Sequence, residues 1–411
     1  MKLTSSSTPC ITLADIETAR NHLASSIFLS PCPHSRSLSQ LTGQEIYLKL
    51  ENLQMTGAFK ERGALNKLLA LDRQEAERGV ITASAGNHAQ GVAYHASRLG
   101  IRARIVMPQP TPLVKVTATI NFGGEVILHG DNYDEAYAHA LRLCGDEGYT
   151  FVHPFDDPAV IAGQGTIGLE LLEQVPGLEA VVVPVGGGGL IGGIACAVKE
   201  KMPGIRVIGV QTARLPSMLV ARANRGPMTI DPAITVADGI AVRRGGEMTF
   251  PLVEHYVDDL VAVEEEDIAS AILVLLEREK TLAEGAGATA LAALLQRKTG
   301  LKGERTAVLL SGGNIDVTLL ARIIERGLVK DGRMVRLRIH MLDRPGALHE
   351  LTRIIAEHRA NIVEILFDRS FYSVNLSETV IDVTFETRNP SQVNELVAAL
   401  SASGYKLEMV H

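Results

Sequence analysis

Short apolar strands alternate with helical segments from residue 45 to residue 310, and this alternation limits the fold to an α/β architecture. Residues 180–185 are apolar throughout, which is typical of a strand that helices cover on both faces. Parallel strands need crossover connections, and the intervening helices provide them. We therefore predict parallel sheets with helices on both faces, and strands at residues 45–51, 79–83, 101–107, 125–128, 180–185, 205–211 and 306–310.

The pattern changes near the carboxyl end of the chain. Residues 335–341 alternate strictly between apolar and polar side chains, as in a strand with one solvated face. The following segments give the order β-α-β-β-α-β, which is ferredoxin-like. We predict a first domain at residues 1–328, a linker at 329–333 and a second domain at 334–411.

Charge and composition exclude several classes of function. The 411 residues carry a formal net charge of −7 and no basic stripe, which argues against nucleic acid as a partner. No apolar run is long enough to span a membrane, and the start of the chain has no signal-peptide pattern. The four cysteines form no C-x-x-C motif, so neither a zinc site nor a disulfide framework is indicated. We expect a cytoplasmic protein.

Lys60 is the first candidate for chemistry. Thr56 and Gly57 resemble a helix start, which places Lys60 in the first turn. The helix dipole and the neighbouring Phe59 should disfavour the ammonium form and lower the pKa of Lys60. A lysine with a lowered pKa can form a Schiff base. The alternative is a solvated lysine on an amphipathic helix.

A run of four glycines follows the buried strand: Gly186, Gly187, Gly188 and Gly189. Glycines let the backbone approach an anion, and the N-terminus of the next helix favours negative charge. A dinucleotide fingerprint also needs an acidic residue at the end of the next strand, where this chain has Gln211. A monophosphate cofactor therefore fits better, and a tight turn without a ligand is the alternative.

Two further turns offer polar groups. Residues 84–90 place Ser84, Asn87 and His88 between a strand and a helix, where free N–H groups could hold a carboxylate. Ser84 could instead be a helix cap, and His88 a structural histidine. Ser311 follows the strand at residues 306–310, at the carboxyl end where open α/β sheets bind ligands.

Lys60, Asn87, the glycine run and Ser311 occur in the order found in fold-type II pyridoxal-phosphate enzymes. The chain resembles the threonine dehydratase and serine dehydratase group of this family over about residues 15–325. The segments Ala-Asp-Gly-Ile-Ala-Val at 237–242 and Ala-Glu-Gly-Ala-Gly-Ala at 283–288 strengthen the resemblance. It implies a two-lobed catalytic domain like that of the tryptophan synthase β subunit, with a small lobe at about residues 52–155.

The resemblance also implies roles at the site. Lys60 would hold pyridoxal 5′-phosphate and, once free, remove the α-proton of the substrate. The other implied contacts are Phe59 beside the cofactor, Asn87 on its 3′-oxygen, Gly186 to Gly189 on its phosphate, Ser311 on its ring nitrogen, and Ser84, Asn87 and His88 on the substrate carboxylate. Lys60 and Ser84 are the expected catalytic residues.

The tail is similar to an ACT domain, with its strand-to-helix turn at residues 343–348. ACT domains bind amino acids and pair between subunits. The resemblance implies an amino-acid effector such as isoleucine or valine, and a homo-oligomer, either a dimer or a tetramer. A purely structural dimerisation domain is the alternative.

Two positions differ from relatives with other activities. Related racemases carry a serine where this chain has Ala85, and a methyl group cannot transfer a proton. Some relatives bind a divalent cation through carboxylates after the strand that ends near Gln211, but residues 211–214 contain none. We therefore expect at most minor racemisation and no metal ion.

The expected activity is that of a threonine ammonia-lyase, which eliminates water from L-threonine or L-serine and releases ammonia with 2-oxobutanoate or pyruvate. A serine or hydroxyaspartate dehydratase and a serine racemase-like enzyme are alternatives of the same fold. A β-replacing synthase is an alternative with the same cofactor. An NAD-dependent oxidoreductase and a non-catalytic amino-acid sensor are alternatives from other classes.

Overall fold

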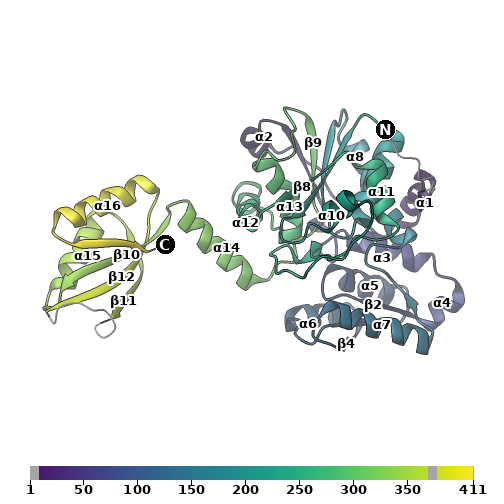
Figure 1. The fold of residues 1–411 in the computed structure, drawn as a ribbon, viewed down its shortest axis with the longest axis horizontal. Coiled ribbons are helices and arrows are strands. Elements are labelled where there is room, and N and C mark those ends of the chain that lie inside the picture. Colours follow the sequence, from purple (N-terminus) through teal and green to yellow (C-terminus); the bar gives the residue numbers. More distant parts are fainter. Residues whose placement is uncertain (1–8, 369–376, 411) are drawn as a thin grey trace. The chain divides into compact units, whose positions relative to one another are not determined.

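The computed structural model describes residues 9–368 and 377–410 and divides into two compact units, residues 1–315 and 316–411. Figure 1 labels many of the helices and strands of both units. The first eight residues, which bear on the absence of a signal peptide, lie outside the described part. Within that part, no helix combines the length and the apolar character needed to span a bilayer.

The first unit contains a five-stranded parallel sheet in the order β1-β9-β6-β7-β8. Every residue of its central strand β6 (Ala180–Pro184) is buried, which confirms the prediction for this segment. The other strands are β1 (Glu45–Leu50), β7 (Arg206–Thr212), β8 (Asp259–Val263) and β9 (Arg305–Leu310). The sequence does not predict β8, a short edge strand followed directly by acidic residues.

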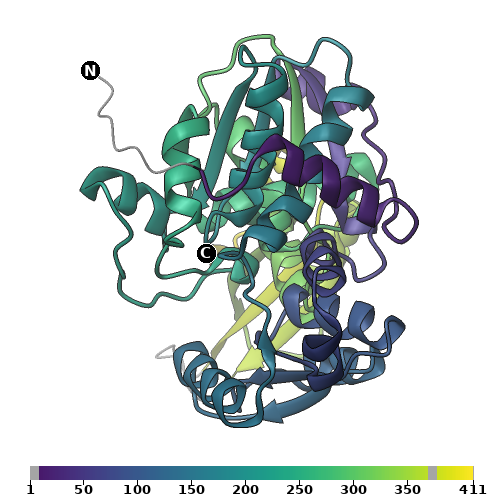
Figure 2. The same cartoon turned by 90° about the vertical axis from the view of Figure 1, so that its right-hand side faces the viewer.

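A second parallel sheet in this unit has the order β4-β3-β2-β5. Its strands are β2 (Val80–Ala83), β3 (Ala103–Met107), β4 (Glu125–Leu128) and β5 (Thr150–Phe151). Figures 1 and 2 show the blue segment that carries this sheet as a smaller body below the five-stranded sheet. The two parallel sheets confirm the predicted α/β class.

Helices cover both sheets. Those that the sequence predicts are α1 (Leu13–Leu23), α3 (Lys60–Leu69), α5 (Asn87–Arg98), α6 (Leu113–Asn121), α7 (Tyr133–Glu147), α8 (Pro158–Gln174), α9 (Gly189–Lys201), α12 (Glu265–Val274) with a π-turn at Leu275–Glu279, and α13 (Gly285–Leu295). It does not predict α2 (Arg36–Thr42), α4 (Arg73–Arg78), α10 (Ser217–Asn224) and α11 (Thr249–Tyr256). These four helices have at most eight residues, which is too short for a clear period.

The second unit begins with α14 (Val317–Lys330), which the sequence does not predict and which Asp316 caps. The remaining elements are β10 (Met334–Leu342), α15 (Ala347–Glu357), β11 (Asn361–Asp368), β12 (Glu378–Glu386), α16 (Pro390–Ala402) and β13 (Lys406–Val410). They form an antiparallel sheet in the order β11-β12-β10-β13, which confirms the predicted ferredoxin-like fold. The unit division places α14 with this sheet, whereas the predicted first domain extends to residue 328.

Candidate functional site

The segment that carries Lys60 pairs with the segment after β9. Ala58 and Gly312 form an isolated antiparallel bridge, and the Phe59 N–H donates to the Ser311 carbonyl at 3.0 Å. Gly57 has a φ of +72°, and its carbonyl accepts from the Gly313 N–H at 2.9 Å. These contacts bring Lys60 and Ser311, which are far apart in sequence, into one site.

Lys60 is the first residue of α3, and Phe59 occupies the N-cap position. The helix therefore starts later than Thr56 or Gly57, although Lys60 does lie in its first turn. Lys60 Nζ donates to the carbonyl oxygen of Pro154 at 2.7 Å and lies 5.2 Å from the centre of the Phe59 ring. This side chain therefore points into the protein.

The predicted direction of the Lys60 pKa shift is confirmed, but its cause differs. Burial lowers the pKa of Lys60 to about 8, and the nearby Glu284 opposes the shift. The ring of Phe59 does not disfavour the ammonium, because a cation over an aromatic face is attracted to it. Desolvation is therefore what brings the free amine into the physiological pH range.

The glycine run forms the turn between β6 and α9, with Gly188 as N-cap at a φ of +97°. A Cβ on Gly187 would overlap the Phe155 ring, and one on Gly189 would lie 2.6 Å from the Phe155 carbonyl oxygen. Within the described residues, no hydrogen bond is recorded for the N–H groups of Gly186, Gly187 and Gly188. The loop is thus a backbone cradle with unpaired donors, as an anion site requires.

Phe155 also connects this loop to the lysine, because it directly follows Pro154, which holds Lys60 Nζ. The Gly187 carbonyl accepts from the Thr249 hydroxyl at 2.6 Å, and the Asp156 carboxylate accepts from three backbone N–H groups at the start of α11. The start of α11 therefore holds both the glycine loop and the segment that follows Pro154 in place.

The turn after β2 contains Ser84, Asn87 and His88. The helix begins at Asn87, with Gly86 as N-cap, so the alternative in which Ser84 caps it is wrong. The Ser84 hydroxyl instead accepts from the Gly86 N–H at 3.3 Å. The first N–H groups of α5 lack partners within the helix, which suits a carboxylate.

His88 is buried, and its Nε2 lies 3.0 Å from the Val152 carbonyl oxygen. Burial lowers the pKa of His88 to about 3, so the imidazole stays neutral at ordinary pH. This environment matches the structural alternative that the sequence leaves open. His88 is placed to support the turn rather than to exchange protons.

Sequence reasoning missed two polar residues at the site. Glu284, at the N-cap of α13, is 4% exposed, and its Oε1 accepts from Asn87 Nδ2 at 2.6 Å. Asn314 Nδ2 donates to Asn87 Oδ1 at 2.9 Å. A carboxylate inside the apolar segment 283–288 was the available signal for Glu284, because a buried acid needs a partner.

The structure also shows what lies around Gln211 and Ala85, the two positions that differ from relatives with other activities. The side-chain oxygen of Gln211 accepts from the N–H groups of Met218 and Leu219 at 3.0 Å each, so this amide fixes the start of α10. Ala85 follows Ser84 in the turn after β2 and offers only a methyl group there.

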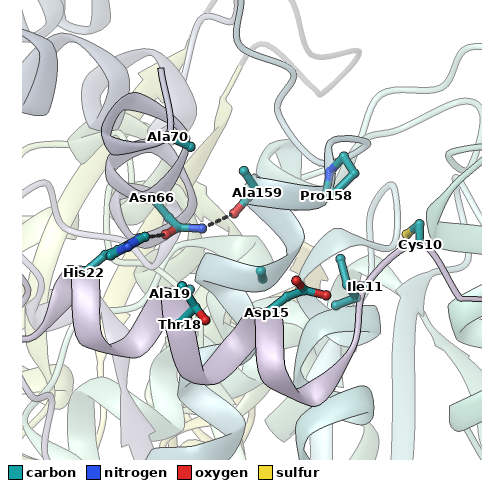
Figure 3. Close-up of a pocket in the computed structure, with 11 residues that line it drawn as sticks. Cys10, Ile11, Asp15, Thr18, Ala19, His22, Asn66, Ala70, Pro158 and Ala159 are labelled. Atoms are coloured by element: carbon teal, nitrogen blue, oxygen red, sulfur yellow. Dashed lines mark hydrogen bonds between the residues drawn. The ribbon is translucent and has the colours of Figure 1, made fainter. Parts of the chain in front are cut away.

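A cavity of about 260 Å³ lies elsewhere in the first unit, between α1, α3 and the start of α8 (Figure 3). Asn66 on its wall is already bonded, to His22 Nδ1 at 3.3 Å and to the Ala159 carbonyl at 2.7 Å. No predicted site residue lines this cavity, so it is separate from the site around Lys60.

Comparison with known protein families indicates which cofactor this site would hold. Residues 24–312 match the model of the pyridoxal-phosphate dependent enzymes. The chain belongs to this family. Residues 335–403 match the ACT domain model, in agreement with the ferredoxin-like second unit.

Individual relatives give the same picture. The chain is 51% identical to an L-threonine ammonia-lyase of Thermotoga maritima over 97% of this chain and 100% of the relative. It is 45% identical to a catabolic L-threonine dehydratase of Escherichia coli K12 over 76% of this chain and 96% of the relative. The structure of maize serine racemase superposes with a TM-score of 0.74 at 33% identity, covering 78% of this chain and 99% of the maize chain.

The residues present fit pyridoxal phosphate. The glycine loop offers unpaired N–H groups to a phosphate, and side chains at Gly187 or Gly189 would close it. Lys60 supplies an amine whose lowered pKa favours bonding to an aldehyde. Asn87 and Ser311 supply a polar amide and a hydroxyl from neighbouring loops, and Ser311 is 2% exposed.

Proposed function

We propose that this family member is a threonine ammonia-lyase, which converts L-threonine to 2-oxobutanoate and ammonia and L-serine to pyruvate and ammonia. The supporting observation is Lys60, whose pKa is lowered to about 8 and whose amine bonds to Pro154, the residue before the Phe155 that packs against the glycine loop. The relationship to the Thermotoga maritima ammonia-lyase over the whole length of that protein supports the choice of reaction.

The chain's own groups have distinct tasks in this proposal. Bound pyridoxal phosphate supplies an electron sink for the charge left on the substrate's α-carbon. Lys60, once released from the cofactor, takes up the α-proton, and its burial keeps enough of the amine neutral to do so. The Ser84 hydroxyl and the backbone N–H groups of Asn87 and His88, at the start of α5, bind the substrate carboxylate. Gly186 to Gly189 bind the cofactor phosphate.

Ser311 favours elimination in this proposal. A neutral hydroxyl cannot hold a protonated ring nitrogen as a carboxylate does, so the charge is stabilised less and departure of the β-substituent is favoured. Ala85 disfavours the serine racemase alternative, even though the maize racemase shares the fold. Racemisation needs a proton donor on the opposite face of the substrate's α-carbon, and the methyl group of Ala85 cannot donate a proton.

We further propose that the second unit binds an amino-acid effector, such as isoleucine or valine, and that the protein is a cytoplasmic homo-oligomer. The ACT match at residues 335–403 supports the effector. We retain residues 334–411 as the regulatory domain, after a linker at 329–333, and residues 52–155 as the small catalytic lobe.

The decisive experiment compares the purified protein with Lys60→Ala. We expect the wild type to show the visible absorbance of bound pyridoxal phosphate and to release 2-oxo acid from threonine and from serine. The variant should lose both signals, because it removes the amine that points into the protein at this site. Normal turnover by Lys60→Ala would refute the proposal.

A further inference from the structure

Three polar side chains from distant parts of the first unit form a continuous hydrogen-bonded line. Asn314 Nδ2 donates to the Thr56 carbonyl oxygen at 2.7 Å and to Asn87 Oδ1 at 2.9 Å. Asn87 Nδ2 then donates to Glu284 Oε1 at 2.6 Å. The line runs from the Lys60 segment, through the start of α5, to the start of α13.

The two ends of this line determine how the amides in the middle are oriented. Thr56 contributes a backbone carbonyl, which can only accept, and an ionised Glu284 also only accepts. Each asparagine has one carbonyl and one NH2 group, so Asn314 must turn its NH2 toward Thr56, and Asn87 must turn its NH2 toward Glu284. Rotating the Asn87 amide by 180° would break both of its hydrogen bonds.

The surroundings leave little room for other arrangements. A Cβ on Gly57 would overlap Asn314, and a Cβ on Gly312 would overlap Glu284 Oε1. The Glu284 N–H also donates to the Gly312 carbonyl at 3.1 Å. Burial raises the pKa of Glu284 to about 7, and the hydrogen bond from Asn87 opposes the shift, as expected when a neighbour prefers the ionised acid.

One N–H of Asn87 remains available. Its Nδ2 carries two hydrogens, and one of them is used on Glu284. Within the described residues, no acceptor is recorded for the other. A donor that is fixed in direction and unpaired suits an oxygen that the protein does not itself provide.

We propose that Asn314 and Glu284 are positioning residues that hold the Asn87 amide in one orientation, so that its free N–H meets the ring oxygen of the cofactor. This inference rests on the proposed role of Asn87 at that oxygen, and it does not depend on which amino acid is the substrate. It gives a role to the asparagine after Ser311-Gly312-Gly313 and to the glutamate of the 283–288 segment.

Two near-isosteric variants of the full-length holoenzyme test the proposal. Glu284→Gln offers an NH2 group to Asn87 and permits the reversed amide. Asn314→Asp removes the NH2 group that both Thr56 and Asn87 Oδ1 accept from. We expect each variant to bind pyridoxal phosphate about ten- to a hundredfold more weakly, because a hydrogen bond involving a charged or fixed partner is lost.

The sharper readout is the absorbance spectrum of the bound cofactor without substrate. The balance of its visible and near-ultraviolet bands reports whether the ring oxygen carries a proton, so losing the Asn87 donor should shift that balance severalfold. A merely structural role would not move it. Because no substrate is present, a failure of the proposed threonine activity is distinguishable from a failure of this inference.

Matched controls are Glu77→Gln and Asn224→Asp, whose side chains lie on exposed helical surfaces. Both controls should keep the wild-type spectrum and affinity. Thermal melting checks folding, and if one site variant melts early, the other decides. Spectra and affinities of the well-folded site variants within twofold of the wild type would overturn the proposal.

Discussion

Lys60 shows what one residue's sequence context can and cannot predict. Its place in a first helical turn and the direction of its pKa shift are predictable from residues 56–64. The cause is not, because the desolvation comes from burial of the amine in the folded unit, where it meets residues that are remote in sequence, such as Pro154. Glu284, which opposes the shift, likewise lies more than two hundred positions away. Local pattern thus identifies the group, while its chemistry depends on the fold.

The lowered pKa gives a prediction for the reconstitution of the apoprotein with pyridoxal phosphate. Only the neutral amine bonds to the aldehyde. With a pKa of about 8, about a tenth of Lys60 is neutral at pH 7, far more than for an ordinary lysine. We expect the rate at which the visible band appears to rise about tenfold per pH unit below pH 8 and to level off above it. Stopped-flow absorbance from pH 6 to 10 measures this.

In Lys60→Ala the visible band should not appear, so this variant gives the baseline for the measurement. A rate that continues to rise through pH 10 would show that Lys60 titrates like an exposed lysine.

At the scale of elements, a buried ion network holds the helix that begins at Lys60. Arg62, on α3, is 1% exposed and pairs with Glu51 at 2.8 Å and with Glu170, on α8, at 2.5 Å. Lys49, on β1, also pairs with Glu170. The network joins α3, α8 and β1, and so fixes the start of α3 relative to the larger sheet.

Removing the Arg62 guanidinium from the centre of this network should lower the free energy of unfolding. In Arg62→Met, Glu51 would keep its buried carboxylate without its main partner, and we expect a loss of about 3–5 kcal/mol in unfolding free energy. Urea denaturation measures this. The matched control is Arg73→Ala, which breaks an exposed pair with Glu77 and should change stability by at most about 0.5 kcal/mol. Equal effects of the two substitutions would contradict a stabilising role for the network.

The sequence predicts some elements of the first unit but not the contacts that hold them together. The strands β2, β6 and β9 follow from apolar runs, because a buried parallel strand needs such a run. The strand β1 follows from the alternation of apolar and polar residues. Pairing among residues 49, 51, 62 and 170 leaves no local sequence signal, since each charge looks like a solvated one until the chain folds. The sequence also did not predict the helix α14, because its fourteen residues directly precede a stretch with linker composition.

For the whole molecule, the two units have separate apolar cores. One is built around β6, α8 and α9, and the other around β10, β12, α15 and α16. The catabolic L-threonine dehydratase of E. coli aligns over 96% of its own length with only 76% of this chain. About a quarter of this chain therefore has no counterpart in the alignment with that relative.

Ending the chain at residue 332 should consequently preserve catalysis and abolish the response to amino acids. The first unit keeps Lys60, the glycine loop and Ser311, so we expect kcat for threonine within about threefold of the full-length value. Activity measured with and without isoleucine and valine should then be equal, because the antiparallel sheet that would bind them is gone. Analytical ultracentrifugation of both forms shows whether assembly also weakens. A truncated protein that still responds to the same effector would place the sensing site in the first unit, and loss of the cofactor's visible band on truncation would show that the catalytic unit needs the tail to fold.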